Sequence, residues 1–263
     1  MALVKTEAII LRTAKMGETS KLLTLYSLKD GILKLIAKGA RSPKSRMGGT
    51  LETLNVVEVV YYEKSNRDLQ FLSQASIVFA PKNLLKDAER TVMAMVCTEM
   101  IARLEKEQNP NASIFGLLRA ALEAFNQENA NGRLILFAFQ MQLLRFLGFA
   151  PDLSQCASCG TGQSIKWQFQ LTDAKLYCNE CLQSLNSGFS LQAATLSGLR
   201  KLAKTPLTNI TAIEIARTSQ AEIYNFLTAF YSNHLEEARF LKTIEVLKQM
   251  KAMERDNFVK RKK

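Results

Sequence analysis

The chain has 263 residues, 47% of them hydrophobic, which is enough for a substantial core in one large or two smaller domains. No apolar run approaches the roughly 20 residues of a membrane span, and the first residues lack the apolar core of a signal peptide, so we exclude an integral membrane protein and expect a soluble cytoplasmic one. The net charge of +11 indicates a polyanionic partner, with a basic surface that has no partner as the alternative.

The first 80 residues have the pattern of a small β-barrel. Glycine or Asp-Gly turns separate five short apolar and β-branched runs, at 4–11, 21–28, 32–37, 54–62 and 69–78. Five strands in about 80 residues match the size of an OB-fold, a Greek-key barrel that often binds nucleic acid. An SH3-like barrel would give nearly the same pattern, so the strand count leaves both architectures open.

After residue 81 the apolar positions follow helical spacing. The predicted helices cover 93–104, 114–125, 134–149, 191–202 and about 220–253. The helix at 134–149 is apolar nearly all round, which predicts a place in the centre of a helical bundle. The predicted fold is therefore α+β: an N-terminal five-stranded OB-fold barrel, the DNA-binding domain, at 1–80, and an all-α domain at 81–263.

Two CxxC pairs lie in a segment at 152–188 that interrupts the helices. Cys156 and Cys159 are followed, after eighteen intervening residues, by Cys178 and Cys181, and the residues between them have the pattern of a hairpin. Each pair places two thiolates on a tight turn, and two such turns supply the four tetrahedral ligands of a structural zinc site. We therefore predict one structural Zn²⁺ per chain. An iron–sulfur cluster and a redox-active dithiol are the alternatives.

No residue pattern predicts catalysis. Cys97 lies on the apolar face of a predicted helix and is expected to be a small buried residue. His234, the only histidine, has no partner motif around it and is expected on a helix surface or at an interface. The chain has no Walker A sequence and no GxGxxG motif after a strand. We expect a binding protein and not an enzyme.

The excess positive charge lies in two segments of the chain. Residues 1–50 hold ten Lys or Arg against three Asp or Glu, residues 251–263 hold six against two, and the rest holds 19 of each sign. Clustered cations neutralise phosphates and release condensed counterions, so a DNA-binding face is expected on the N-terminal barrel and on its Gly- and Ser-containing loop at 38–49. The predicted DNA-binding residues are Lys15, Lys21, Lys34, Lys38, Arg41, Lys44 and Arg46.

Several aromatic residues lie on or near the predicted strands. Their rings could stack on unpaired bases, although most are expected in the barrel core. They are Tyr26, Tyr61, Tyr62 and Phe71.

Two segments resemble the RecO family of recombination proteins. In the segment 4–46, a Gly-Glu turn follows the first strand, and a Lys-Gly-Ala-Arg segment leads into a Lys-Ser-Arg loop, as in the N-terminal domain of that family. The segment Leu147-Gly-Phe-Ala-Pro151, followed by the two CxxC pairs, is similar to the family's entry into its zinc module. The resemblance spans nearly the whole chain.

The resemblance implies an N-terminal OB-fold, a helical C-terminal domain and a four-cysteine zinc module beside it. The implied activity is to bind single- and double-stranded DNA, to anneal complementary strands and, with RecR and often RecF, to load RecA onto DNA coated by single-strand-binding protein. The acidic, aromatic-ended tail of that protein is expected to bind an apolar pocket with a basic rim in the helical domain. The alternatives are a zinc-containing scaffold that binds only proteins and an unrecognised nucleic-acid-processing enzyme.

Overall fold

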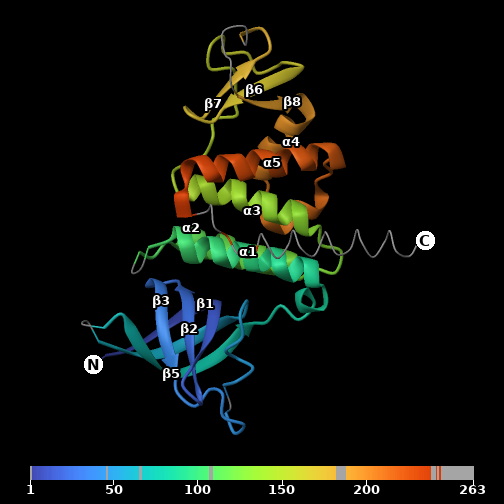
Figure 1. Cartoon of the computed structure of the whole chain (residues 1–263). Helices are drawn as coiled ribbons and strands as arrows, with labels where there is room; N and C mark the ends of the chain where they lie inside the picture. Colours follow the sequence, from blue (N-terminus) through green and yellow to red (C-terminus); the bar gives the residue numbers. More distant parts are fainter. Residues whose placement is uncertain are drawn as a thin grey trace, which may run out of the picture. The chain divides into compact units, whose positions relative to one another are not determined.

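The computed structural model describes two compact units of the chain. The first comprises Met1–Gly132 with Phe240–Lys263, and the second comprises Arg133–Arg239 (Figure 1). The predicted domain boundary after residue 80 lies between the barrel and the helices of the first unit, and it stays a prediction. The described residues are 2–45, 47–64, 67–106, 109–181, 188–237, 241 and 243.

The first unit begins with a closed five-stranded barrel, as predicted. Its strand order is β1-β2-β3-β5-β4, with β4 paired back to β1 and with β3 and β5 parallel. This is the five-stranded Greek-key barrel of an OB-fold, so that prediction is confirmed. The strands are β1 (Ala2–Met16), β2 (Ser20–Ser27), β3 (Gly31–Ala37), β4 (Val56–Glu63) and β5 (Leu69–Phe79).

Alternate residues of these strands point into the barrel and form its core. Ile10, Leu23, Leu35, Val59 and Tyr61 are all almost fully buried there. The period of two follows from the pleat of a β-strand, which sends successive side chains to opposite faces. The outward residues are therefore the ones available to a ligand.

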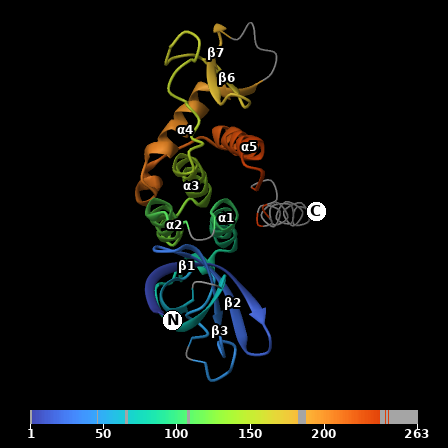
Figure 2. The ribbon, with the colours of Figure 1, turned by 90° about the vertical axis from the view of Figure 1, so that its left-hand side faces the viewer.

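Two helices of the first unit pack on one end of the barrel (Figure 2). Tyr26, near the end of β2, donates a hydrogen bond of 3.1 Å from its hydroxyl to Glu105 Oε2. Arg119 forms an ion pair with Glu7 of β1. A Cβ added at Gly31, which has a φ of +67°, would lie 2.6 Å from a backbone oxygen of the helix connection, so this approach requires glycine. The helices are α1 (Ala88–Leu104) and α2 (Ala112–Phe125), and the short η1 (Leu84–Lys86) precedes them.

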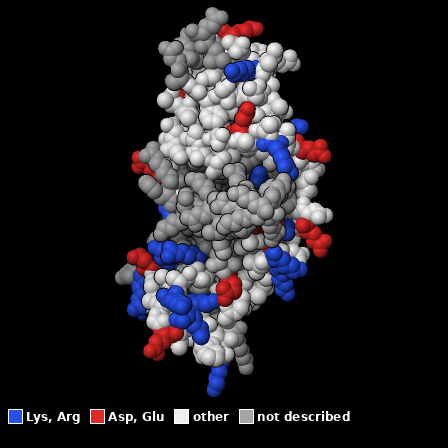
Figure 3. All heavy atoms as spheres, turned by 45° about the vertical axis from the view of Figure 1, so that its right-hand side comes forward, with Lys and Arg blue, Asp and Glu red and all other residues white. Residues whose placement is uncertain are grey.

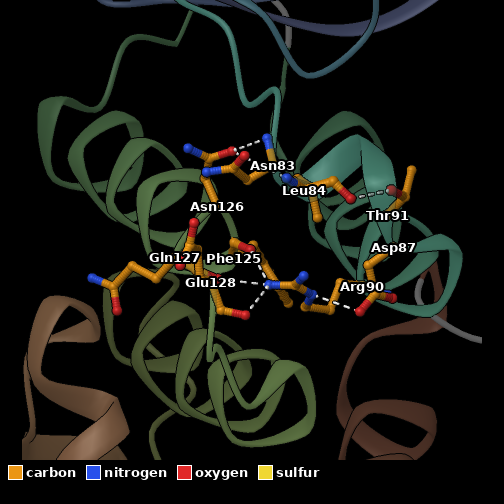
Figure 4. Close-up of polar contacts among 9 residues, drawn as sticks. All are labelled: Asn83, Leu84, Asp87, Arg90, Thr91, Phe125, Asn126, Gln127 and Glu128. Atoms are coloured by element: carbon orange, nitrogen blue, oxygen red, sulfur yellow. Dashed lines mark hydrogen bonds and ion pairs between the residues drawn. The ribbon is translucent and has the colours of Figure 1, made fainter.

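A polar network fixes the segment that leads from the barrel into α1 (Figure 4). Asn126, at the end of α2, accepts hydrogen bonds with its Oδ1 from the backbone N–H groups of Asn83 and Leu84, at 2.9 and 3.1 Å. Arg90 binds the Asp87 carboxylate at 2.8 Å. Its Nη1 also donates to the carbonyl oxygens of Phe125, Gln127 and Glu128.

The second unit combines helices with a small antiparallel sheet of order β7-β6-β8. Nearly every residue from Leu134 to Leu144 is buried, which agrees with the central helix predicted there. None of the helices that the structure describes is long and apolar enough to cross a membrane. The elements are α3 (Gly132–Phe146), β6 (Lys166–Gln170), β7 (Lys175–Cys178), β8 (Phe189–Gln192), α4 (Ala193–Lys204), η3 (Leu207–Ala212) and α5 (Arg217–His234).

Two predicted helices are present but have wrong boundaries. The helix predicted at 220–253 ends at His234, because Leu235 is extended, with φ −133° and ψ 94°, and is buried. Most of the predicted helix beyond this point lies outside the described residues. The start of the helix predicted at 191–202 instead belongs to β8, which pairs with β6 and displaces the helix to α4.

Candidate metal centre and nucleic-acid interface

The four cysteine sulfurs of the predicted metal site come together in the second unit. All four Sγ atoms lie within 4.8 Å of one another, and the Cys159 and Cys178 sulfurs are 3.7 Å apart. One pair precedes β6, while Cys178 ends β7 and Cys181 follows it. Among the residues that the structure describes, this is the one cluster of His, Cys, Asp or Glu arranged to hold a metal ion.

Backbone hydrogen bonds hold the first cysteine pair in a tight turn. Gly160 has a φ of +73°, in the left-handed region that favours glycine, and its N–H donates to the carbonyl of Cys156 at 2.9 Å. The N–H of Ala157 donates to the carbonyl of Leu176 in β7 at 2.8 Å. The predicted hairpin therefore carries both cysteine pairs, because β7 ends in the second pair and anchors the first.

The electrostatics of the cluster favour a bound cation. Burial acts to raise the pKa of Cys156, but backbone N–H groups of Cys159, Cys178 and Ser158 point at its sulfur and lower the pKa to about 6. A hydrogen bond from Ser158 acts to lower the pKa of Cys181, yet the thiols of Cys178 and Cys159 beside it raise the pKa to about 12. Four thiolates this close repel one another, so a metal ion is what allows all four to ionise.

The donor set limits what such a metal could do. Four thiolates suit zinc or an iron–sulfur cluster, and they leave no open coordination position for a substrate. The cluster therefore fits a structural site, which supports the fold of the hairpin. The residues present fit the predicted metal, and they require no further ligand.

The two other candidate reactive residues have ordinary structural positions. Cys97 of α1 is completely buried, and burial raises its pKa well above the usual value, so the prediction of a buried core residue is confirmed. His234 lies at the end of α5, half-buried, with its ring centroid 4.4 Å from that of Phe230. Neither belongs to the four-cysteine cluster.

The strand register places most of the predicted basic residues at one end of the barrel. Lys15 pairs with Lys21 across β1 and β2, and Lys21 pairs with Ala37, next to Lys38. This end is opposite to the one that α1 and α2 cover, because β2 runs from Lys21 toward Tyr26. Lys15, Lys38 and Lys44 are exposed here, whereas Lys34 lies half-buried in the middle of β3.

Lys21 and Arg41 are engaged within the protein. Lys21 Nζ donates to Glu52 Oε1 at 2.9 Å and to the carbonyl of Leu51 at 3.2 Å. Arg41 Nη1 donates to two carbonyl oxygens of the β1–β2 turn, those of Gly17 and Glu18, both at 3.0 Å. Both side chains hold loops in place, and their contact with DNA stays a prediction. Arg46 lies outside the described residues.

Of the four aromatic residues, two are buried and two are partly exposed. Tyr26 and Tyr61 are buried, and desolvation together with the carboxylates of Glu105 and Asp30, respectively, raises the pKa of each hydroxyl. Tyr62 is 39% exposed and Phe71 is half-buried. The expectation of a barrel-core position therefore holds for Tyr61 alone, because Tyr26 is buried on the outer face of β2, where its hydroxyl contacts Glu105.

The structure adds basic residues that counting charges along the sequence missed. Lys64 and Arg67 join the predicted Lys34 in the lining of a hollow of about 290 Å³, together with the carboxylates of Asp30, Glu63 and Asp68. Lys64 and Arg67 lie in the β4–β5 loop, which OB-folds commonly use to bind oligonucleotides. The three carboxylates of this hollow offset its three cations, so a count of charges along the sequence does not single it out and only the fold indicates it. On the face shown in Figure 3, blue and red side chains intermingle over the barrel in the same way.

Comparisons with known proteins agree with this architecture. The family model described as Recombination protein O N terminal matches residues 1–81, and Recombination protein O C terminal matches residues 85–243. A protein named DNA repair protein RecO from Chlorobium limicola is 27% identical over 257 residues, which cover 94% of this chain and 98% of that protein. Its namesake from Pelodictyon phaeoclathratiforme is 29% identical over 263 residues, with the same two coverages. The one from Prosthecochloris aestuarii is 33% identical over 158 residues, 60% of each chain.

Proposed function

This chain belongs to the recombination protein O (RecO) family, and from that premise we propose that it is a mediator of DNA repair and recombination which binds single- and double-stranded DNA and anneals complementary strands. With RecR, and with RecF, it would help to load RecA onto DNA coated by single-strand-binding protein. The role is one of binding and not of catalysis, and we place it on chromosomal DNA in the cytoplasm.

The observation that carries the DNA-binding proposal is the difference between the two ends of the barrel. Helices cover one end of the OB-fold, and lysines that the structure leaves exposed, Lys15, Lys38 and Lys44, gather at the other. Cations on this face would neutralise the phosphates of two strands at once without reading their sequence. The lower repulsion between the strands would let base pairing drive annealing, which requires no nucleotide hydrolysis.

The test is a salt titration of DNA binding by the variant Lys15→Gln/Lys44→Gln. Each phosphate contact adds about 0.7 to the slope of log affinity against log salt for single strands, so losing two should lower that slope by about 1.4. The matched control is Lys166→Gln/Lys175→Gln, which removes two exposed lysines of the second unit. A protein that binds no DNA at low salt would contradict the proposal and favour a scaffold that binds only proteins.

We propose further that the four cysteines hold one structural Zn²⁺. The close approach of the four sulfurs and the hydrogen bonds to Cys156 support this assignment. Metal analysis of the purified protein should give one zinc per chain, and Cys178→Ser should lose most of it. Cys97→Ser is the control, because its sulfur lies outside the cluster and should leave the metal content unchanged. Iron together with visible absorption would indicate an iron–sulfur cluster instead.

A hollow in the second unit supports the proposed binding of the single-strand-binding protein's acidic, aromatic-ended tail. It has a volume of about 420 Å³, and its lining combines apolar residues such as Met141 and Leu153 with the cations Arg145 and Lys204. An aromatic side chain would fit the apolar part, and acidic residues would pair with the cations. A tail peptide should bind the full chain by isothermal titration calorimetry, and Lys204→Glu should weaken it about tenfold or more, as for reversal of a paired charge. Equal affinity for the variant would place the tail elsewhere.

A further inference from the structure

Two aromatic residues form a neighbouring pair on the outer surface of the barrel. Tyr62 of β4 lies directly opposite Phe71 of β5 in the strand register. The residues next to them, Tyr61 and Leu72, point into the core and are 1% and 9% exposed. Because successive side chains of a strand alternate between its faces, Tyr62 and Phe71 both face outward.

The outer surface around this pair is apolar. Leu3 of β1 pairs with Tyr62 on the other side, and Ile36 of β3 pairs with Phe71, so the four residues form a row across neighbouring strands. Leu3 is 62% exposed and Tyr62 39% exposed, which leaves the row open at its β1 and β4 side.

A lysine stands beside the pair. Lys38, which follows β3, holds its Nζ 4.6 Å from the centre of the Phe71 ring. The ammonium lies within the distance at which a cation is attracted to an aromatic face. The ammonium occupies this face of the ring, and its transfer to a DNA phosphate would free the face for a base, so the ring and the cation match the two parts of a nucleotide.

We propose that Tyr62, Phe71 and Lys38 form a stacking surface for the unpaired bases of single-stranded DNA. The proposal rests on the proposed function, and it gives a reason why the protein would prefer single-stranded over duplex DNA. Bases in a duplex are already stacked and cannot reach the rings, whereas phosphates are available in both forms. Adjacent strands lie about 4.8 Å apart, so rings on β4 and β5 are close enough for successive bases of one extended strand.

The other two barrel tyrosines do not compete for this role. Tyr26 and Tyr61 are buried, and their hydroxyls bond carboxylates inside the first unit. A stacking role for Tyr61 would require the barrel to open, and one for Tyr26 would require the helices to leave the end of the barrel. The outward pair is therefore the part of the aromatic set that a DNA strand can contact.

The test compares the variants Tyr62→Leu and Phe71→Leu with wild type, on single-stranded and duplex DNA of one length. Leucine keeps an apolar side chain on the strand, and circular dichroism and thermal melting check that the barrel folds. Each variant should bind the single strand about tenfold more weakly, within the range known for loss of one stacked base, and should bind the duplex as wild type does. Quenching of a 2-aminopurine base in the single strand should fall, and the salt slope should stay the same. Tyr224→Leu, a half-buried tyrosine of α5, is the matched control.

The outcomes separate this proposal from the proposed function. If wild type binds no DNA, the proposed function fails. If wild type binds with a steep salt slope but the aromatic variants keep full single-strand affinity and quenching, only the stacking surface is overturned. Equal losses on single-stranded and duplex DNA, with a lower melting temperature, would also overturn it, because the pair would then support the barrel.

Discussion

Arg90 joins the start of α1 to the end of α2, next to the connection between barrel and helices. Its side chain is 14% exposed, and it binds the Asp87 carboxylate and three carbonyl oxygens at the end of α2 (Figure 4). Arg90→Met leaves these acceptors without their donor, and we expect a loss of about 2–3 kcal/mol in the free energy of unfolding. Arg90→Lys should recover only part of it, because a single ammonium cannot replace the guanidinium fork.

The measurement for Arg90 is urea unfolding followed by far-ultraviolet circular dichroism. Tryptophan fluorescence would not report on this unit, because the one tryptophan of the chain, Trp167, lies in the second. Arg12→Met, an exposed arginine of β1, is the control and should change stability little. If Arg90→Met unfolds at the same urea concentration as this control, the network contributes nothing.

The N-cap of α1 makes part of the stability depend on pH. The N–H of Arg90 donates to the Asp87 carboxylate at 2.9 Å, and this bond is the main reason that the pKa of Asp87 lies below the usual value of 3.8. A carboxyl with a lowered pKa stabilises the fold above its unfolded pKa, and the contribution is lost as the pH falls through the folded value. Asp87→Asn should therefore unfold more easily than wild type at pH 7, and the difference should shrink at and below about pH 4.

Thermal melting of both proteins at pH 7 and at pH 3 tests the role of Asp87. Asparagine keeps the ability to cap the helix, so the comparison isolates the charge. A gap between the two melting temperatures that is equally wide at pH 3 would show that the ionised carboxylate is not its cause.

At the same scale, the sequence predicted which residues are charged but not what they bind. Lys21 and Arg41 belong to the basic N-terminal segment. Lys21 nevertheless donates a hydrogen bond to Glu52, and Arg41 donates to the backbone of the β1–β2 turn. Those partners lie 31 and 24 residues away, so no local pattern reveals them. The clustering of the four cysteines was easier to predict, because the spacing within each CxxC pair already fixes the local geometry.

The small sheet of the second unit carries its own reporter of metal binding. Trp167 of β6 is 1% exposed and pairs directly with Cys178 of β7. Removal of the metal with a chelator should loosen the hairpin, because a structural site contributes its binding energy to folding. We expect the tryptophan emission to shift to the red and the shift to reverse when zinc is returned. The far-ultraviolet circular dichroism of the whole protein should change little, because the barrel and the helices keep their fold.

The variant Cys181→Ser should show the shifted emission without a chelator. Cys97→Ser should not, although it removes a cysteine that is more deeply buried. An emission maximum that stays constant while the metal leaves would mean that the hairpin holds its fold without the ion.

Among the elements, the barrel strands were predictable from the sequence, whereas the boundaries of helices and strands in the second unit were not. The barrel strands are runs of apolar and β-branched residues separated by turns such as the one before Gly31, so their patterns are local. Strand β8 is only four residues long, and it exists because Phe169 of β6 offers a partner for Phe189. The end of α5 follows from the burial of Leu235 in an extended conformation, which helical spacing cannot foresee.

At the scale of the whole molecule, Thr243 links the last part of the chain to the first unit. That unit joins Met1–Gly132 with Phe240–Lys263, although these segments stand at opposite ends of the chain. The backbone N–H and the hydroxyl of Thr243 donate to Glu99 Oε2 of α1 at 2.9 and 2.6 Å, and Leu241 beside it is buried. This contact anchors the chain just before the basic residues 251–263.

The anchor predicts that the basic tail acts on the same DNA as the barrel. A chain that ends at residue 250 loses six Lys or Arg, so the salt slope of single-strand binding should fall by at most about 4. Thr243→Val removes one of the two hydrogen bonds and should lower DNA affinity in the full chain, by a few fold, as expected for a loosened tether. In the shortened chain the same substitution should have no effect on DNA binding, because the tail it positions is gone. An equal effect of Thr243→Val in both chains would contradict the tether and assign Thr243 to the stability of α1 alone.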